Sequence, residues 1–121
     1  FLGAELRRGI EIVFSLVGLA EKLAGADLVL TGEGQIDHQT VFDKAPAGVG
    51  AAAKKMNIPC LAIAGSVGDN LGDLHACGID AVFSICSRPM GLEDAMKSAE
   101  ALVATATEQA LRAFLAGTPR R

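Results

Sequence analysis

The sequence predicts an α/β fold in which helices cover both faces of a three-stranded parallel sheet. Short apolar segments typical of strands alternate with segments whose apolar residues recur at helical spacing. The three strand segments are apolar throughout, as is usual for strands buried on both faces. Since the order is helix–strand three times and then a final helix, right-handed crossovers would place every strand-to-helix connection at one edge of the sheet.

The first predicted helix covers residues 9–23. Its apolar positions recur at spacings of three and four, at Ile10, Val13, Phe14, Val17 and Ala20. Gly25 ends this helix, because glycine readily adopts the backbone conformation that follows a helix. The first strand is predicted at residues 27–31, and a long polar connection, residues 32–44, follows it.

The second predicted helix covers residues 45–56. Pro46 suits its first turn, where a missing N–H costs nothing. Asn57 favours a left-handed stop, and Pro59 prevents continuation of the helix. The second strand is predicted at residues 60–64.

A short third helix, residues 71–77, is expected to end at Gly78, and a third strand follows at residues 81–86. The last helix is predicted at residues 92–115. Glu93 and Asp94 would complement the helix dipole in its first turn. One face of this helix carries Met96, Ala99, Val103, Ala106, Ala110 and Phe114.

The composition excludes several classes of function. The 121 residues suffice for one domain, half of them are hydrophobic, and the formal net charge is −3. There are five Phe and no Trp or Tyr, and no basic stripe is visible, so nucleic-acid binding is not expected. No apolar segment is long enough to cross a bilayer, so no membrane partner is expected.

The three cysteines, Cys60, Cys77 and Cys86, are an odd number without metal-site spacing. We interpret them as reduced, buried structural thiols, which indicates a cytoplasmic protein.

The expected functional edge of the sheet is where its strands end, because ligands bind beyond the carboxyl ends of parallel strands. Three connections meet there: residues 32–44, 65–72 and 87–91. The first is longer than such connections usually are, which favours a functional role over a plain surface loop.

Two glycines, Gly32 and Gly34, could let backbone N–H groups approach an anion. A tight turn is the alternative, because the spacing matches neither the dinucleotide fingerprint nor the P-loop. Between and after them, Glu33 and Asp37 supply carboxylates that could hold Mg²⁺. Asp37 could instead act as a general base, and capping of nearby N–H groups is the structural alternative for both residues.

Lys44 stands at the mouth of the second predicted helix, where a cation is unfavourable beside the positive end of the dipole. Either a bound phosphate or carboxylate compensates it, or a neighbouring acidic residue such as Asp43 does. Gln39 in the same connection and Ser66 in the next could add polar contacts to a ligand.

Several segments resemble the bacterial type I glycerate kinase family. The specific ones are Asp-Leu-Val-Leu-Thr-Gly-Glu-Gly-Gln-Ile-Asp at residues 27–37, Gln39-Thr40, and Lys-Ala-Pro at residues 44–46. Residues 3–11, 61–65 and 78–84 are similar as well, so the resemblance runs along nearly the whole chain.

The resemblance implies a phosphotransferase that uses ATP and Mg²⁺ to phosphorylate D-glycerate. Members are much longer and combine a flavodoxin-like or Rossmann-like α/β domain with an inserted second domain. Residues 1–121 would then be the carboxyl-terminal part of the first domain, inactive without the upstream part and the second domain. Its open sheet edges would favour self-association.

The resemblance also implies roles for individual residues in the cleft between the domains. Asp37 and Lys44 are expected to be catalytic, with Asp37 near the glycerate hydroxyl or the metal and Lys44 on a phosphate or the glycerate carboxylate. Glu33 is expected to bind the metal. Substrate or nucleotide contacts are expected from Gly32, Gly34 and Gln39, and also from Ser66 because of its place in the next connection. The alternative is a non-catalytic α/β module that binds an anionic ligand or a partner subunit.

Overall fold

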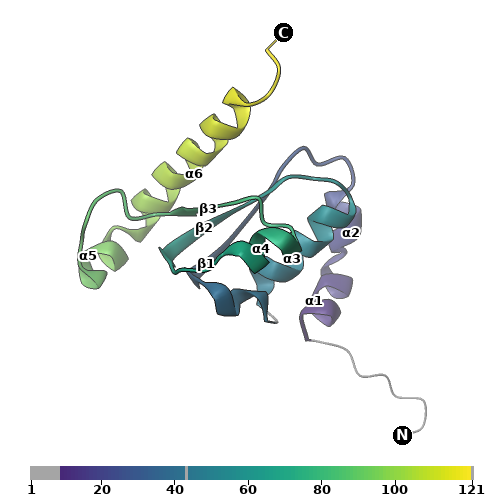
Figure 1. Ribbon diagram of the computed structural model, residues 1–121, viewed down its shortest axis with the longest axis horizontal. Coiled ribbons are helices and arrows are strands. Elements are labelled where there is room, and N and C mark those ends of the chain that lie inside the picture. Colours follow the sequence, from purple (N-terminus) through teal and green to yellow (C-terminus); the bar gives the residue numbers. More distant parts are fainter. Residues whose placement is uncertain (1–8, 43, 121) are drawn as a thin grey trace, which may run out of the picture.

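A three-stranded parallel sheet forms the centre of the molecule, as predicted (Figure 1). The computed structural model describes residues 9–42 and 44–120. The strands lie in the order β1-β2-β3, so β2 is central. Their bounds are β1 Val29–Ile36, β2 Cys60–Val67 and β3 Ala81–Ser84.

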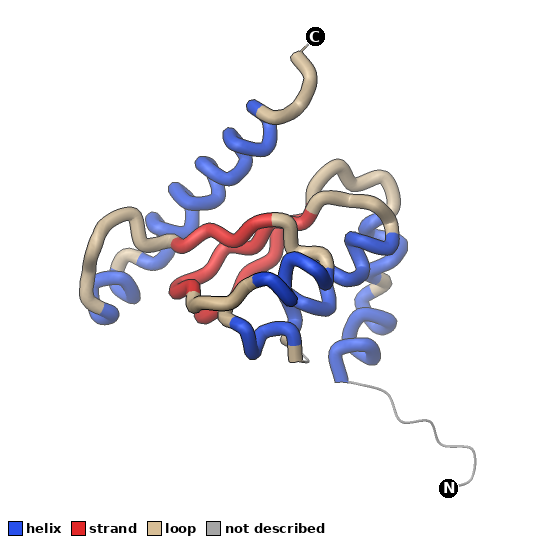
Figure 2. The backbone as a smooth tube through the Cα atoms, viewed as in Figure 1, coloured by secondary structure: helices blue, strands red, loops and turns tan. Residues whose placement is uncertain are grey.

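Helices cover both faces of the sheet, which confirms the predicted layers (Figure 2). One face carries α1 (Gly9–Val17), α2 (Leu19–Leu23), α3 (Ala45–Lys55) and α4 (Gly72–Cys77). The other face carries α6 (Ala99–Ala116), preceded by the short helix α5 (Leu92–Lys97). A single 3₁₀ turn, η1 (His38–Val41), connects β1 to α3.

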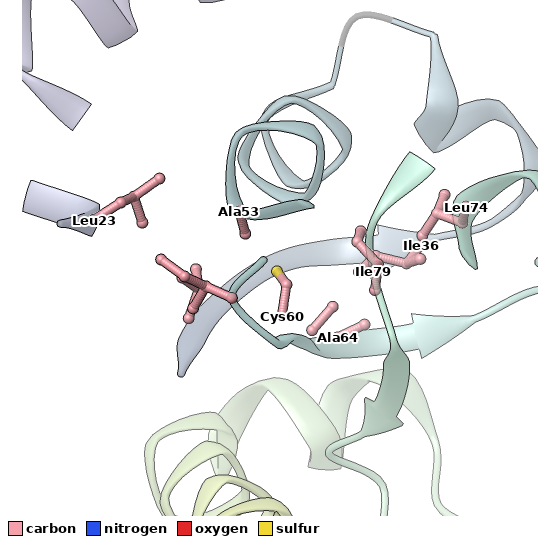
Figure 3. Close-up of a cluster of buried hydrophobic side chains, with 10 residues drawn as sticks. Leu23, Ile36, Ala53, Cys60, Ala64, Leu74 and Ile79 are labelled. Atoms are coloured by element: carbon pink, nitrogen blue, oxygen red, sulfur yellow. The ribbon is translucent and has the colours of Figure 1, made fainter. Parts of the chain in front are cut away.

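Residues of β2 alternate between two hydrophobic cores, because successive side chains of a strand point to opposite faces. Cys60, Ala62 and Ala64 belong to the core under α3 and α4, with Ile36, Leu74 and Ile79 (Figure 3). Leu61 and Ile63 belong to the core under α6. Both faces of the strand are therefore apolar, which explains its unbroken apolar sequence.

The strand bounds differ from the prediction at the carboxyl ends. Strand β1 continues to Ile36, because Glu33 pairs with Ala64 and Gln35 pairs with Ser66 of β2. The predicted polar connection is therefore strand in its first part. Pairing with β1 likewise extends β2 to Val67. In contrast, β3 is shorter than predicted and ends at Ser84.

Two predicted helices are each divided by one residue. Gly18 adopts a left-handed conformation (φ 65°) and separates α1 from α2. Ser98 separates α5 from α6, because its backbone (φ −102°, ψ 12°) leaves the helical region. The prediction was accurate for α3 and α4, and the left-handed stop at Asn57 is confirmed (φ 56°).

The predicted apolar stripe of the first helix is only partly buried. Ile10 and Phe14 pack beside Gly48 of α3, where an added Cβ would come within 2.8 Å of the Phe14 ring. Val13 and Val17 are 51% and 47% exposed. The break at Gly18 changes the direction of the helix, so a stripe continuous in sequence does not face one core.

Candidate functional site

A cavity of about 950 Å³ opens at the carboxyl ends of β1 and β2, between the sheet and the α5–α6 segment. The strand ends contribute Gly32, Glu33, Gly34, Gly65 and Ser66 to its wall. Apolar side chains complete the wall on the helical side: Met90, Leu92, Met96 and Val103. This is the edge of the sheet where the sequence predicts a ligand.

The two strands approach each other closely at their glycines. A Cβ added at Gly65 would lie 2.5 Å from the Gly34 carbonyl oxygen, and a Cβ at Gly32 would lie 2.9 Å from the Ile63 carbonyl oxygen. A Cβ at Gly34 would instead meet nothing within 4 Å. Packing therefore requires glycine at positions 32 and 65, whereas at position 34 the missing side chain leaves open space beside the cavity.

Glu33 brings a carboxylate to the cavity wall. The side chain is exposed, and its Oε1 accepts a hydrogen bond from the Gly34 N–H at 3.4 Å. Among residues 9–42 and 44–120, no three His, Cys, Asp or Glu side chains form a group that could hold a metal ion. A single carboxylate is sufficient for an Mg²⁺ ion whose other ligands are nucleotide phosphates and water, which is the usual arrangement for this ion.

Asp37 caps the turn that follows β1. Its Oδ1 accepts a hydrogen bond from the Gln39 backbone N–H at 2.8 Å, and its Oδ2 accepts one from the Gln35 side-chain amide at 3.0 Å. The Asp37 N–H donates to the Thr40 hydroxyl at 3.0 Å, which completes a capping box. The capping alternative considered for this carboxylate is therefore present in the structure.

Lys44 is the N-cap residue of α3 and is exposed. It lines a separate cavity of about 140 Å³ together with Val41, Ala47 and Cys77. This cavity lies on the α3 face of the sheet, opposite the α5–α6 face. Asp43, the neighbouring candidate for an ion pair, lies outside the described residues.

The structure thus divides the predicted site into three groups. One group shares the large cavity: Gly32, Glu33, Gly34 and Ser66. A second group, Asp37 and Gln39, belongs to the capped turn η1 and its N-cap. Lys44 lines the smaller cavity on the α3 face, which it shares with Val41 of η1.

Sequence reasoning missed Cys86 as a residue of the cavity wall. We expected a buried thiol, but Cys86 is exposed, because β3 ends two residues earlier. Its Sγ lies 3.7 Å from the Gly65 carbonyl oxygen, to which the thiol donates. The sequence did offer one signal for Cys86, its position just beyond the third strand, because the expected functional edge lies where the strands end.

The other two cysteines are more protected. Burial raises the pKa of the Cys60 thiol to about 11, and the Asp80 carboxylate adds to the shift. Burial also raises the pKa of Cys77, although the nearby Lys54 ammonium opposes it. All three thiols are free among the described residues, and Cys77 is only partly buried, less than predicted.

This parallel sheet, with a cavity walled by glycines and a carboxylate at its carboxyl edge, defines an α/β protein of the kind that binds small ligands beyond its strand ends. The model of the glycerate kinase family matches residues 1–115. The chain therefore belongs to the glycerate kinase family.

Individual relatives agree with this assignment. A glycerate kinase from Bacillus cereus (strain ATCC 10987 / NRS 248) is 52% identical over 99 residues, which cover 82% of this chain and 26% of that protein. A glycerate 2-kinase from Escherichia coli (strain K12) is 48% identical over 99 residues, with the same coverage of 82% and 26%.

A solved structure is similar as well. The crystal structure assigned as glycerate kinase 2 from Salmonella typhimurium LT2 aligns with a TM-score of 0.62 and 44% identity, over 94% of this chain and 29% of that one. The chain therefore spans between a quarter and a third of the length of such relatives. In the described part of the chain, no helix has the length and apolar character needed to cross a membrane.

Proposed function

We propose that this chain forms part of an enzyme that transfers the terminal phosphoryl group of ATP to a hydroxyl group of D-glycerate. Membership of the glycerate kinase family supports a kinase and disfavours the alternative of a non-catalytic binding module. The cytoplasm, which supplies ATP and Mg²⁺, is the location that we propose for it.

The observation that carries the proposal is the open glycine at the cavity wall. At Gly34 the backbone is exposed and the position of a Cβ is empty, although the neighbouring glycines are closely packed. Phosphate oxygens can approach exposed backbone that carries no side chain, and the Gly34 N–H, which donates to Glu33 Oε1 at 3.4 Å, would turn to the phosphate. Phosphoryl transfer depends mainly on such positioning and on neutralisation of charge, so this wall suits a nucleotide phosphate chain.

In this proposal, Glu33 is a ligand of Mg²⁺ and the cavity accepts the nucleotide. When bound, the ion would neutralise charge on the phosphates. Gly32, Gly34 and Ser66 contribute wall contacts to nucleotide or substrate.

Asp37 is proposed to accept a hydrogen bond from the hydroxyl group of the substrate. A carboxylate offers about four acceptor positions. The Gln39 N–H, the Gln35 amide and, in the capping box, the Thr40 N–H use three of them. Acceptor capacity therefore remains for a substrate, and Gln39 is placed beside it on η1.

Lys44 is proposed as an anion contact on the other face. It stands where α3 begins, so a phosphate or carboxylate there would meet both its ammonium group and the unpaired N–H groups of the helix start. A second segment of the enzyme must bring that anion to this face, because the large cavity lies across the sheet.

We further propose that residues 1–121 act as the carboxyl-terminal part of the α/β domain and are inactive alone. Support comes from the relatives, of which the chain covers only 26–31% in the cases with 44–52% identity. Residues from the remaining length would complete the nucleotide and substrate contacts.

The test measures ADP formation by the full-length gene product with ATP, Mg²⁺ and D-glycerate, and by the 121-residue chain under the same conditions. We expect turnover from the full-length protein and none from the chain. Glycerate dependence is the control for ATP hydrolysis. A full-length protein that is folded but forms no ADP in a glycerate-dependent manner would contradict the proposal.

A further inference from the structure

We propose that Thr40 is a positioning residue, whose buried hydroxyl fixes the turn that holds the proposed catalytic carboxylate of Asp37 at the end of β1. The inference rests on the kinase function proposed above. Thr40 does not itself line the cavity. Its hydrogen bond would position Asp37 from outside the cavity.

The burial of Thr40 is the first observation. Its exposed fraction is 1%, and among residues 9–42 and 44–120 it is the one polar or charged residue that is buried. Burying a hydroxyl without a hydrogen bond is unfavourable. The hydroxyl accepts from the Asp37 N–H at 3.0 Å, so its burial is compensated by a bond to the residue whose carboxylate it would position.

The second observation is that bonds to Asp37 come from both sides of it in the sequence. The Gln39 N–H lies 2.8 Å from Oδ1, and the Gln35 amide nitrogen lies 3.0 Å from Oδ2. Together with the Thr40 hydroxyl on the backbone N–H, these bonds fix both the main chain and the carboxylate of Asp37. A single shift of the turn would therefore move the carboxylate.

The third observation connects the turn to the glycine wall. A Cβ at Gly68 would come within 2.7 Å of the Asp37 Cβ, and the Gly68 N–H donates to the Ile36 carbonyl at 2.8 Å. These contacts join the ends of β1 and β2, the strands that carry Gly34 and Gly65. The turn also packs against α3 and α4. The turn thus fixes Asp37 relative to the ends of β1 and β2, although Asp37 itself does not line the cavity.

Thr40→Val tests the hydroxyl, because valine keeps the branched shape and removes the acceptor. In the full-length protein, with the folded state checked by circular dichroism, we expect kcat for glycerate phosphorylation to fall about 10- to 100-fold, the scale of a misplacement of about 1 Å. The KM for ATP should stay within about twofold. Thr40→Ser keeps the hydroxyl and should restore kcat to within about threefold of the wild type.

Thr118→Val is the matched control. The Thr118 hydroxyl also bonds locally to the main chain, at 2.7 Å from the Leu115 carbonyl, but it lies just beyond the end of α6. We expect wild-type kcat for this variant. Wild-type kcat in folded Thr40→Val, or an equal loss in Thr40→Ser and Thr40→Val, would overturn the inference.

A double-mutant cycle separates positioning from a general loss of stability. If Thr40 acts through Asp37, then Thr40→Val should cause no further loss of kcat in an Asp37→Ala background, whereas independent effects would multiply. If Thr40→Val does not fold, Thr40→Ala replaces it, because alanine also removes the hydroxyl and adds no bulk at this buried position. Wild-type kcat in folded Thr40→Ala would then overturn the inference.

Different experimental results would contradict the proposed function and this inference. A wild-type protein without glycerate kinase activity removes the proposed function. An active wild-type protein whose Thr40 and Asp37 effects multiply removes only the positioning role.

Discussion

Gly65 faces Gly34 across the β1–β2 pair so closely that a Cβ on Gly65 would lie 2.5 Å from the Gly34 carbonyl oxygen, whereas a Cβ on Gly34 would meet open space. Two glycines that look alike in the sequence therefore serve different purposes. Gly65 is required by packing, whereas Gly34 leaves open space beside the cavity.

This difference predicts opposite outcomes for two alanine substitutions. Gly65→Ala should lower the free energy of unfolding by about 1–3 kcal/mol, because the main chain must move to admit the methyl group. Gly34→Ala should change it by less than about 0.5 kcal/mol, as for a surface site. Urea unfolding of both variants provides the measurement.

The same pair tests the site in the full-length protein. Gly34→Ala should remain folded and still raise the KM for ATP or lower kcat by more than about 10-fold, a loss of about 1.4 kcal/mol. Wild-type kinetics in Gly34→Ala would mean that no ligand approaches this wall.

Labelling of the thiols should follow their exposure. Cys86 is exposed, Cys77 is partly buried and Cys60 is buried, so an aromatic disulfide reagent at neutral pH should modify Cys86 first and Cys60 only on unfolding. Because Cys86 lines the large cavity, ATP with Mg²⁺ should slow its labelling in the full-length protein. A Cys86→Ala variant shows which part of the labelling comes from Cys86. Labelling of Cys86 that ATP does not change would place the nucleotide elsewhere.

The Cys60 thiol predicts a loss of stability at alkaline pH. Its pKa is raised from 9.0 to about 11 in the folded chain. Above pH 9 the unfolded state releases this proton while the native thiol keeps it, so the contribution is complete below pH 9 and is lost as pH rises toward 11. The total is on the order of 2 kcal/mol.

Comparison with Cys60→Ala isolates this effect from the titration of other groups. The difference in unfolding free energy between the wild type and Cys60→Ala should be constant below pH 9 and should decrease above it. Cys86→Ala, which removes an exposed thiol, should show the same alkaline slope as the wild type. A difference between the wild type and Cys60→Ala that stays constant above pH 9 would assign the alkaline loss of stability to another group.

Lys44→Ala tests the cation at the start of α3. If its ammonium binds a reacting or bound anion, the substitution in the full-length protein should cost at least about 2 kcal/mol in kcat/KM, about 30-fold. Lys55→Ala, at the other end of α3, is the control for a change in net charge. A loss below about threefold for Lys44→Ala would exclude this lysine from the site.

Self-association of the 121-residue chain is expected from its sheet edges. Among the described residues, β1 and β3 each pair only with β2, so each leaves one edge open. Sedimentation over a range of concentrations should show a mass that rises with concentration. The full-length protein at equal molar concentration is the comparison, and a chain that stays monomeric would contradict the expectation.

Much of the fold could be predicted because its signals are local. Pro46 and Asn57 mark the ends of α3, and Gly78 with φ 123° ends α4 where expected. The continuous apolar run of β2 indicated burial on both faces. The breaks at Gly18 and Ser98 were missed, since a periodic apolar pattern continues across a single residue with another conformation.

The candidate site was predicted only in part. Glu33, Gly34 and Ser66 do share a cavity, because parallel strands end at one edge. Lys44 was grouped with them from its nearness in sequence, but the chain passes through η1 to the other face before reaching it. Packing against elements that are distant in sequence decides on which face of the sheet a connection lies.

By itself, the sequence determined the order of helices and strands, the parallel sheet and the family, since periodicity, turn residues and a long matching segment are properties of neighbouring residues. The tertiary structure alone decided how far β1 extends, because that depends on hydrogen bonds to β2. It also distinguished Gly34 from Gly65, because the space available to a side chain is set by the strand beside it.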